Sequence, residues 1–172
     1  MKSHILSICG LALLLIGIFL SPQAVSAGPP EKVESTERCP VCGMFVAKYP
    51  NWVTQIQYTE GHPKYFDGVK DLMAHFFSPA AYGFTPELLA KEIWVKDYYS
   101  LKWIDGRSAV YVTGSDVFGP MGKEFIPFST QESAENFLKD HHGKKVLLFH
   151  EITSEMVESM RSGHKMKGHM KK

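Results

Sequence analysis

The sequence has little of what marks several common classes of small protein. It contains only three cysteines in 172 residues, and its net charge at neutral pH is +1. Disulfide-stabilised mini-proteins carry about four or more cysteines, and nucleic-acid-binding domains carry a strong positive charge, so both classes are excluded. No nucleophile stands beside a base, no glycine-rich loop suits a phosphate, and no motif brings two carboxylates together. We therefore predict a protein that is not an enzyme.

The first 27 residues have the parts of a secretory signal peptide. A basic start at Lys2 precedes an apolar run over residues 5–20, and small side chains lead up to Ala27. The run is shorter than the roughly 20 apolar residues of a membrane span, and no basic cluster follows it directly. We expect cleavage after Ala27, export, and no transmembrane span in the mature protein; an uncleaved anchor is the alternative. The mature chain would keep only two thiols.

The first half of the mature chain, residues 39–99, has an α+β pattern. Alternating apolar and polar residues predict strands over residues 52–58 and 63–66. Asp67 is placed to cap a helix with apolar residues at helical spacing, and a returning strand follows over residues 92–99. This half is therefore predicted to be a ββαβ unit.

The second half, residues 100–155, has the same order of elements. Strands are predicted over residues 109–115 and 123–128. Ser129 opens a capping-box pattern for a helix, and residues 145–152 close the unit as a strand. The second half is therefore predicted to be another ββαβ unit.

The strand-to-helix junctions at Asp67 and Ser129 hold equivalent places in the two halves. The sequence thus predicts an α+β fold of two tandem ββαβ units packed as one small protein, although two halves can also resemble each other by chance. A polar leader over residues 28–38 precedes the units, and a tail rich in Met, His and Lys follows over residues 156–172.

Cys39 and Cys42 stand three residues apart in "CPVCGM", a spacing with several chemical uses. A thioredoxin-type dithiol begins a helix after a strand, whereas no strand precedes Cys39 and Gly43 opposes a helix. Structural zinc needs a second Cys or His pair at a fixed spacing, and none is present. A disulfide would close a very small loop and stabilise the fold little, but it stays open as an alternative.

Two methionines favour a soft metal. Met44 follows Cys42 by two residues, so on an extended chain the thiolate and the thioether lie on the same side. Met121 stands in a turn, "GPMG", with no apolar neighbour to share a core face. Because thioethers discriminate against hard cations and suit Cu(I), we predict that Cys42, Met44 and Met121 meet at one cuprous ion if the halves pack face to face. Packing is the alternative role for each methionine.

The tail carries further soft donors. Met156 and Met160 fit one face of a short helix, but beyond Gly163 that explanation fails. A solvated basic tail is the alternative. We expect loose capture of Cu(I) by four residues of the tail, His164, Met166, His169 and Met170.

Four segments together resemble one protein family: "CPVCGMFVAKYPNW", "YFDGVKDLMAHF", "YVTGSDVFGPMGKEFIPF" and "KVLLFHEI". That family is NosL, exported copper-binding accessory proteins of nitrous oxide reductase. The resemblance implies a periplasmic Cu(I) chaperone that passes copper to an acceptor in the machinery maturing the enzyme's copper-sulfide centre. It also implies that Cys42 and Met44 match the family's Cys-x-Met ligands and that Met121 matches its later methionine. We expect a monomer or a copper-bridged dimer.

Two departures from the family and two alternatives remain. Many members are lipoproteins, whereas this chain resembles a protein with an ordinary cleavable signal. Cys39 is an additional thiol, which we expect to be a third sulfur ligand or a bystander rather than a disulfide partner. A thiol oxidoreductase or an organomercurial-lyase-type catalyst would use Cys39 and Cys42. The stretch "CPVCGM" followed by "YF" is also similar to YHS or TRASH metal-trafficking domains, which usually have another cysteine where "FDG" stands here.

Overall fold

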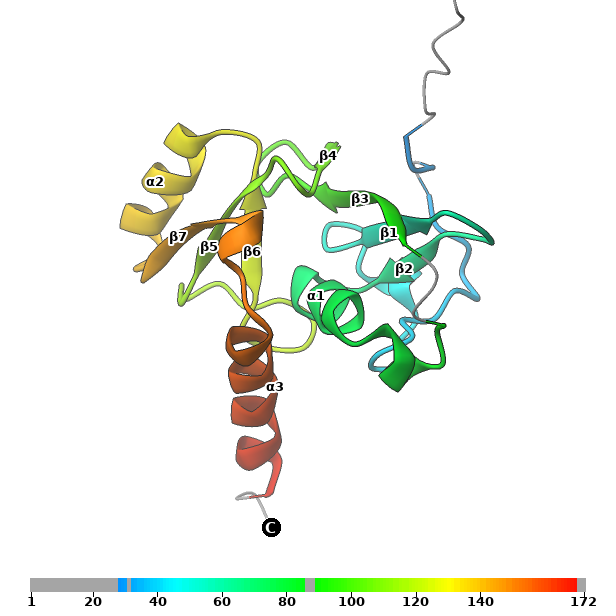
Figure 1. Cartoon of the computed structure of the whole chain (residues 1–172). Coiled ribbons are helices and arrows are strands. Elements are labelled where there is room, and N and C mark those ends of the chain that lie inside the picture. Colours follow the sequence, from blue (N-terminus) through cyan, green and yellow to red (C-terminus); the bar gives the residue numbers. More distant parts are fainter. Residues whose placement is uncertain (1–27, 31, 86–88, 170–172) are drawn as a thin grey trace, which may run out of the picture.

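The computed structural model describes residues 28–30, 32–85 and 89–169 (Figure 1). The predicted signal peptide over residues 1–27 and the tail residue Met170 lie outside this part. Within the described part, no helix is both long enough and apolar enough to cross a bilayer.

The first unit contains a four-stranded antiparallel sheet and one helix. Its elements are β1 (Thr54–Tyr58), β2 (Lys64–Phe66), α1 (Val69–Phe77), β3 (Ala90–Lys96) and β4 (Trp103–Asp105). The strand order is β2-β1-β3-β4, with every neighbouring pair antiparallel. β4 was not predicted; it extends the first sheet although it follows residue 100.

The second unit repeats this arrangement with one strand fewer. It consists of β5 (Val110–Thr113), β6 (Phe125–Phe128), α2 (Gln131–Asp140) and β7 (Lys145–Leu148), with strand order β6-β5-β7. In both units the first strand lies between the second and the third, and the helix connects the latter two. The predicted α+β fold with two tandem ββαβ units is therefore confirmed.

Three short 3-10 helices complete the connections: Val46–Lys48, Pro79–Tyr82 and Phe149–Glu151. The last of these ends the final strand earlier than the sequence pattern predicted, so His150 lies in a 3-10 turn rather than in a strand.

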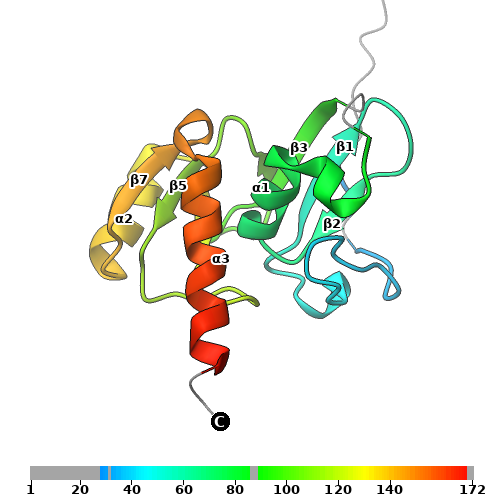
Figure 2. The ribbon, with the colours of Figure 1, turned by 60° about the horizontal axis from the view of Figure 1, so that its bottom comes forward.

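The C-terminal segment is a helix, α3 (Ser154–His169), rather than an unpacked tail. It packs along α1 (Figure 2). Val157 is buried, and Met156 and Met160 are partly buried against the core, so these two methionines have the packing role that their spacing allowed. The apolar stripe is short, which is why the sequence pattern alone predicted so little helix here.

Both predicted helix caps were wrong by one residue. α1 begins after Gly68, and no side chain caps it, because the carboxylate of Asp67 is engaged elsewhere. α2 begins after Thr130, whose hydroxyl accepts a hydrogen bond of 3.1 Å from the backbone N–H of Ser133. Asp67 is therefore available for another role.

The main hydrophobic core joins the two units. It contains Ile56, Phe66 and Leu72 of the first unit, and it also contains Phe125 and Leu147 of the second. α1 lies between the two sheets in both views, while α2 covers a smaller core on the second sheet (Figures 1 and 2). Separating the units would expose the buried faces of both, so they form one packed body.

His75 is a fully buried histidine of α1. Its Nδ1 shares a hydrogen bond of 2.7 Å with the Tyr58 hydroxyl, and its ring lies among the aromatic rings of Phe66, Tyr82 and Phe84. Burial, helped by the positive charge of Lys64, lowers the pKa of His75 to about 4. The imidazole is therefore held neutral.

This burial predicts acid sensitivity of the fold. Between pH 6.5 and about 4 the unfolded chain binds a proton that folded His75 does not, so stability falls as the pH is lowered through this window, by up to about 3 kcal/mol. Urea denaturation at pH 7 and pH 4.5 should show a smaller loss for His75→Gln than for the unmutated protein. His62→Gln, a change at an exposed turn residue, should leave the loss unchanged. Equal losses in all three proteins would contradict the assignment.

Candidate metal centre

A tight loop brings the two cysteines together. Arg38 and Phe45 pair as a bridge at its base, the Cys39 N–H donates to the Met44 carbonyl (2.9 Å), and the Gly43 N–H donates to the Cys39 carbonyl (2.8 Å). Gly43 has a φ of 77°, which a residue with a side chain rarely adopts. The loop that carries both thiols is therefore closed by its own backbone hydrogen bonds.

Arg38 holds this loop closed from outside. Its guanidinium lies 3.8 Å from the centre of the Phe45 ring and donates a hydrogen bond of 2.9 Å to the Gly43 carbonyl. Both interactions hold the chain around the cysteines without using either sulfur, so the thiols stay available for a ligand.

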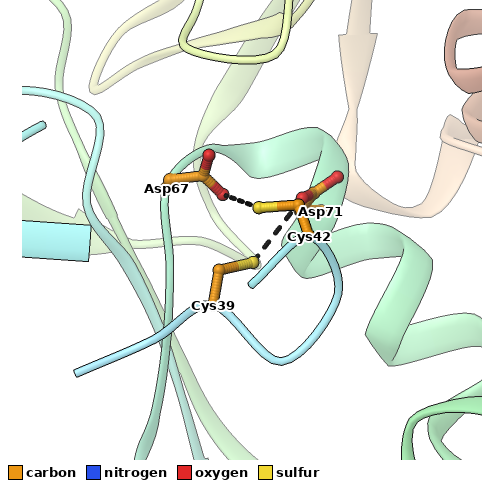
Figure 3. A group of neighbouring side chains, drawn as sticks. All are labelled: Cys39, Cys42, Asp67 and Asp71. Atoms are coloured by element: carbon orange, nitrogen blue, oxygen red, sulfur yellow. Dashed lines mark hydrogen bonds between the residues drawn. The ribbon is translucent and has the colours of Figure 1, made fainter. Parts of the chain in front are cut away.

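Two buried carboxylates face the thiols (Figure 3). The Cys42 thiol donates to Asp67 Oδ1 at 3.3 Å, and the Cys39 thiol donates to Asp71 Oδ2 at 3.5 Å. One ligand atom from each of the four residues lies within 4.8 Å of all the others. Both cysteines are free thiols, so the structure does not contain the alternative disulfide.

The carboxylate pair is a feature that the sequence analysis missed. Asp67 and Asp71 are four residues apart across the start of α1, and both are almost fully buried. Asp67 lies two residues before α1 and Asp71 lies in its first turn, so two carboxylates at one helix start were the available signal. It was overlooked because Asp67 was interpreted as a helix cap.

The electrostatics of the cluster favour its protonated form when no metal is bound. The pKa of Cys39 is raised by its interaction with Cys42, by burial, and by the charges of Asp71 and Asp67. Burial and the neighbouring Asp67 also raise the pKa of Asp71. A cation that binds here must displace protons and would relieve the repulsion between the anionic groups.

Met121 belongs to a tight turn that is hydrogen-bonded to Lys70 in the first turn of α1. Gly119 and Gly122 exchange backbone hydrogen bonds of 2.8 and 3.0 Å. The buried ammonium of Lys70 donates to the carbonyls of Met121 (2.6 Å) and Lys123 (2.9 Å). The turn is half-buried, and Lys70 holds it against the helix that carries Asp71.

Glu124 completes this attachment. Its carboxylate accepts hydrogen bonds from the backbone N–H groups of Lys70 and Phe125, and burial raises its pKa to about 8. A Cβ atom at Gly68 would collide with Glu124 Oε2, so a side chain at position 68 would displace this carboxylate. Lys70 and Glu124 are two residues of the site that the sequence analysis did not select, because a lone Lys and a lone Glu are usually exposed.

Met44 lies half-buried directly after Gly43. The reason given for its convergence with Cys42 was wrong, because the left-handed turn at Gly43 interrupts the extended chain. Its role as a ligand stays a prediction, as does the meeting of the Met121 sulfur with Cys42. Three residues of the tail lie within the bounds of α3: His164, Met166 and His169. Met170 lies outside the described residues, and the donor role of all four stays a prediction.

The fold and the site together define a small α+β protein in which paired thiols and carboxylates form a group that could hold a metal ion. Within this class the chain belongs to the NosL family, whose sequence model matches residues 30–157. The match spans both ββαβ units and includes the two cysteines and Met121.

Three individual proteins are similar to this chain. The chain is 26% identical over 165 residues to the copper-binding lipoprotein NosL of Stutzerimonas stutzeri, covering 86% of this chain and 83% of the relative. The crystal structure of the copper chaperone NosL from Shewanella denitrificans is similar, with a TM-score of 0.61 and 28% identity, over 74% of this chain and 99% of that one. The solution structure of apo-NosL from Achromobacter cycloclastes has 29% identity and a TM-score of 0.45, over 60% of this chain and 87% of that one.

The attachment of the Met121 turn can be tested by removing the ammonium of Lys70. Lys70→Met keeps the length of the side chain but leaves two buried carbonyls without a donor, so we expect a loss of about 2–4 kcal/mol in urea denaturation. Amide hydrogen exchange should also accelerate at residues 121–124. Lys139→Met, at an exposed position of α2, is the matched control and should change neither quantity. Unchanged exchange in Lys70→Met would show that the turn is held in another way.

Proposed function

We propose that this protein is an exported Cu(I) chaperone, which carries copper as cargo for the assembly of the copper-sulfide centre of nitrous oxide reductase. The observation that carries the proposal is the pair of free thiols in one closed loop, beside the helix to which the turn of Met121 is fastened. Family membership and the copper-binding names of the relatives support it.

The donors suit a monovalent soft ion. Thiolate and thioether sulfurs favour Cu(I), which accepts two to four such ligands without a strict geometry. Cys42 and Cys39 would supply the thiolates, Met44 would supply a thioether from the same loop, and Met121 would supply one from the turn held by Lys70. Each of the four residues lies in the body of the protein at a partly or fully buried position.

Unequal exposure of the two thiols suits transfer. Cys39 is 1% exposed, whereas Cys42 is only partly buried. An acceptor thiolate would therefore reach copper on the Cys42 side and replace that ligand first, while Cys39 still holds the ion. Stepwise exchange of this kind moves copper without releasing it, and about 1.4 kcal/mol of difference in affinity shifts the partition tenfold.

The location and the tail complete the proposal. The segment over residues 1–27 would direct export to the periplasm, where the mature chain acts without a membrane span. The proposed acceptor is a protein of the reductase's maturation machinery, and the chaperone acts as a monomer or as a copper-bridged dimer. Loose capture of copper would fall to four residues at the C-terminal end: His164, Met166, His169 and Met170.

Copper affinity of variants tests the ligand set. Under anaerobic competition with a Cu(I) chelator, the reduced protein should bind one Cu(I) in its folded body. Cys42→Ser should weaken Cu(I) binding about 100-fold or more, and Met121→Leu about tenfold. Each change removes one sulfur donor and leaves a side chain of similar size. Cys39→Ser should lower the Cu(I) affinity if Cys39 is a ligand and leave it unchanged if Cys39 is a bystander.

Met156→Leu is the control, since this methionine packs on the core. It should bind copper like the unmutated protein. Unchanged affinity in both Cys42→Ser and Met121→Leu would overturn the proposed site.

A further inference from the structure

The outer face of the first sheet is covered, although an antiparallel sheet can leave one face to solvent. Alternation along β1 and β3 places Gln55 and Lys96 on this face, whereas Ile56 and Val95 point to the main core. Gln55 and Lys96 are nevertheless only 5% and 7% exposed. The N-terminal segment lies beside this sheet (Figures 1 and 2), and the two together enclose a cavity.

This cavity has a volume of about 240 Å³. Four apolar residues of the N-terminal segment line it: Val33, Ala47, Pro50 and Val53. Folded proteins pack closely and keep few voids larger than a water molecule, whose share of liquid volume is about 30 Å³. Sites for drug-sized ligands measure about 300–1,000 Å³, so this cavity is slightly smaller than they are. Its size therefore fits a small organic molecule.

The charged side chains that line the cavity are positive. They belong to Lys32 of the leader and Lys96 of β3, and no Asp or Glu of the described part of the chain joins them there. The Lys96 ammonium lies 4.5 Å from the centre of the Trp103 ring, which forms another wall. Because the local dielectric constant in such a cavity is lower than in water, these cations attract an anionic group strongly.

Trp103 offers a hydrogen-bond donor to the same ligand. Its Nε1 is buried and has no hydrogen-bond partner within the residues that the structure describes. An indole N–H can only donate, and a buried donor without an acceptor costs free energy. A small rotation of the ring would direct this N–H to an oxygen atom in the cavity, so a bound carboxylate would provide the missing acceptor.

We propose that this cavity binds a small organic anion, with its carboxylate beside Lys96 and Trp103 and a short apolar body between the apolar walls. A bare inorganic anion is disfavoured, because it would lose its water without gaining apolar contacts. The carboxylate can belong to a free acid or to the C-terminus of a peptide that ends in an apolar residue. None of the cysteines and aspartates of the candidate metal centre lines the cavity. The inference therefore goes beyond copper delivery and does not depend on it.

The test uses phenylacetate as the probe on the reduced full chain, and NMR follows the indole N–H signals. The Trp103 signal, identified by its absence in Trp103→Phe, should shift and saturate with a dissociation constant of about 1 mM or below. Phenylacetamide has the same shape without the charge and should bind at least about tenfold more weakly.

N-acetylglycyl-phenylalanine separates the two sources of the carboxylate. Tighter binding than phenylacetate would support the anion site and assign it to a peptide C-terminus. Weaker binding would support the anion site and assign it to a free acid, since the added peptide would not fit the cavity.

Variants of the lining residues test the position of the ligand. Lys96→Met keeps the length of the side chain without its charge and should weaken phenylacetate binding at least about tenfold. Ala47→Leu enlarges an apolar wall and should abolish binding by filling the cavity. Lys102→Met is the matched control and should leave binding unchanged, because Lys102 is exposed and does not line the cavity. If Lys96→Met does not fold, Ala47→Leu and phenylacetamide decide.

Three results would overturn the inference. The first is a Trp103 signal that does not shift at about 20 mM phenylacetate, and the second is equal affinity for phenylacetate and phenylacetamide. The third is unchanged phenylacetate binding in folded Lys96→Met and Ala47→Leu. The Cu(I) affinity of both variants should equal that of the unmutated protein, so failure of the copper proposal and failure of this inference are distinguishable.

Discussion

The attachment of the second unit to the first turn of α1 is the constraint on which the rest of this structure depends. The backbone N–H of Lys70 donates to Glu124, and the ammonium of Lys70 donates to the turn of Met121. One residue therefore connects the helix that carries Asp71 with the turn that carries the distant methionine. Because α1 also lies between the two sheets, its position is fixed by the main core. That packing therefore sets how the thiols, the carboxylates and the turn of Met121 lie relative to one another.

The candidate metal centre is built from short local segments whose relative positions are set by the core. Backbone hydrogen bonds and Arg38 close the cysteine loop, and Asp67 just before α1 and Asp71 in its first turn supply the carboxylates. The energetic cost lies in the buried charges, since burial and neighbouring anions raise the pKa of both Cys39 and Asp71. Such a site is preorganised in shape but is electrostatically unsatisfied without a cation.

The strand patterns and the family resemblance predicted the fold well, because alternation and helical spacing reflect which side chains are buried. The missed elements have weak patterns. β4 has only three residues, and α3 buries a narrow stripe. The thiols were identified from their spacing, whereas Asp67 and Asp71 acquire their role only when the loop folds onto α1. A local interpretation of Asp67 as a cap was reasonable and wrong, because the competing partner, Cys42, lies 25 residues away.

The absence of a side chain at Gly68 has a consequence for how this family can vary. The carboxylate of Glu124 occupies the space that a Cβ atom at position 68 would need. A larger residue at 68 is therefore tolerable only if position 124 shortens at the same time, and a single change at either position opens a gap or a clash. A substitution at position 68 alone would therefore displace the carboxylate that accepts from the backbone N–H groups of Lys70 and Phe125, and so loosen the joint between the two units.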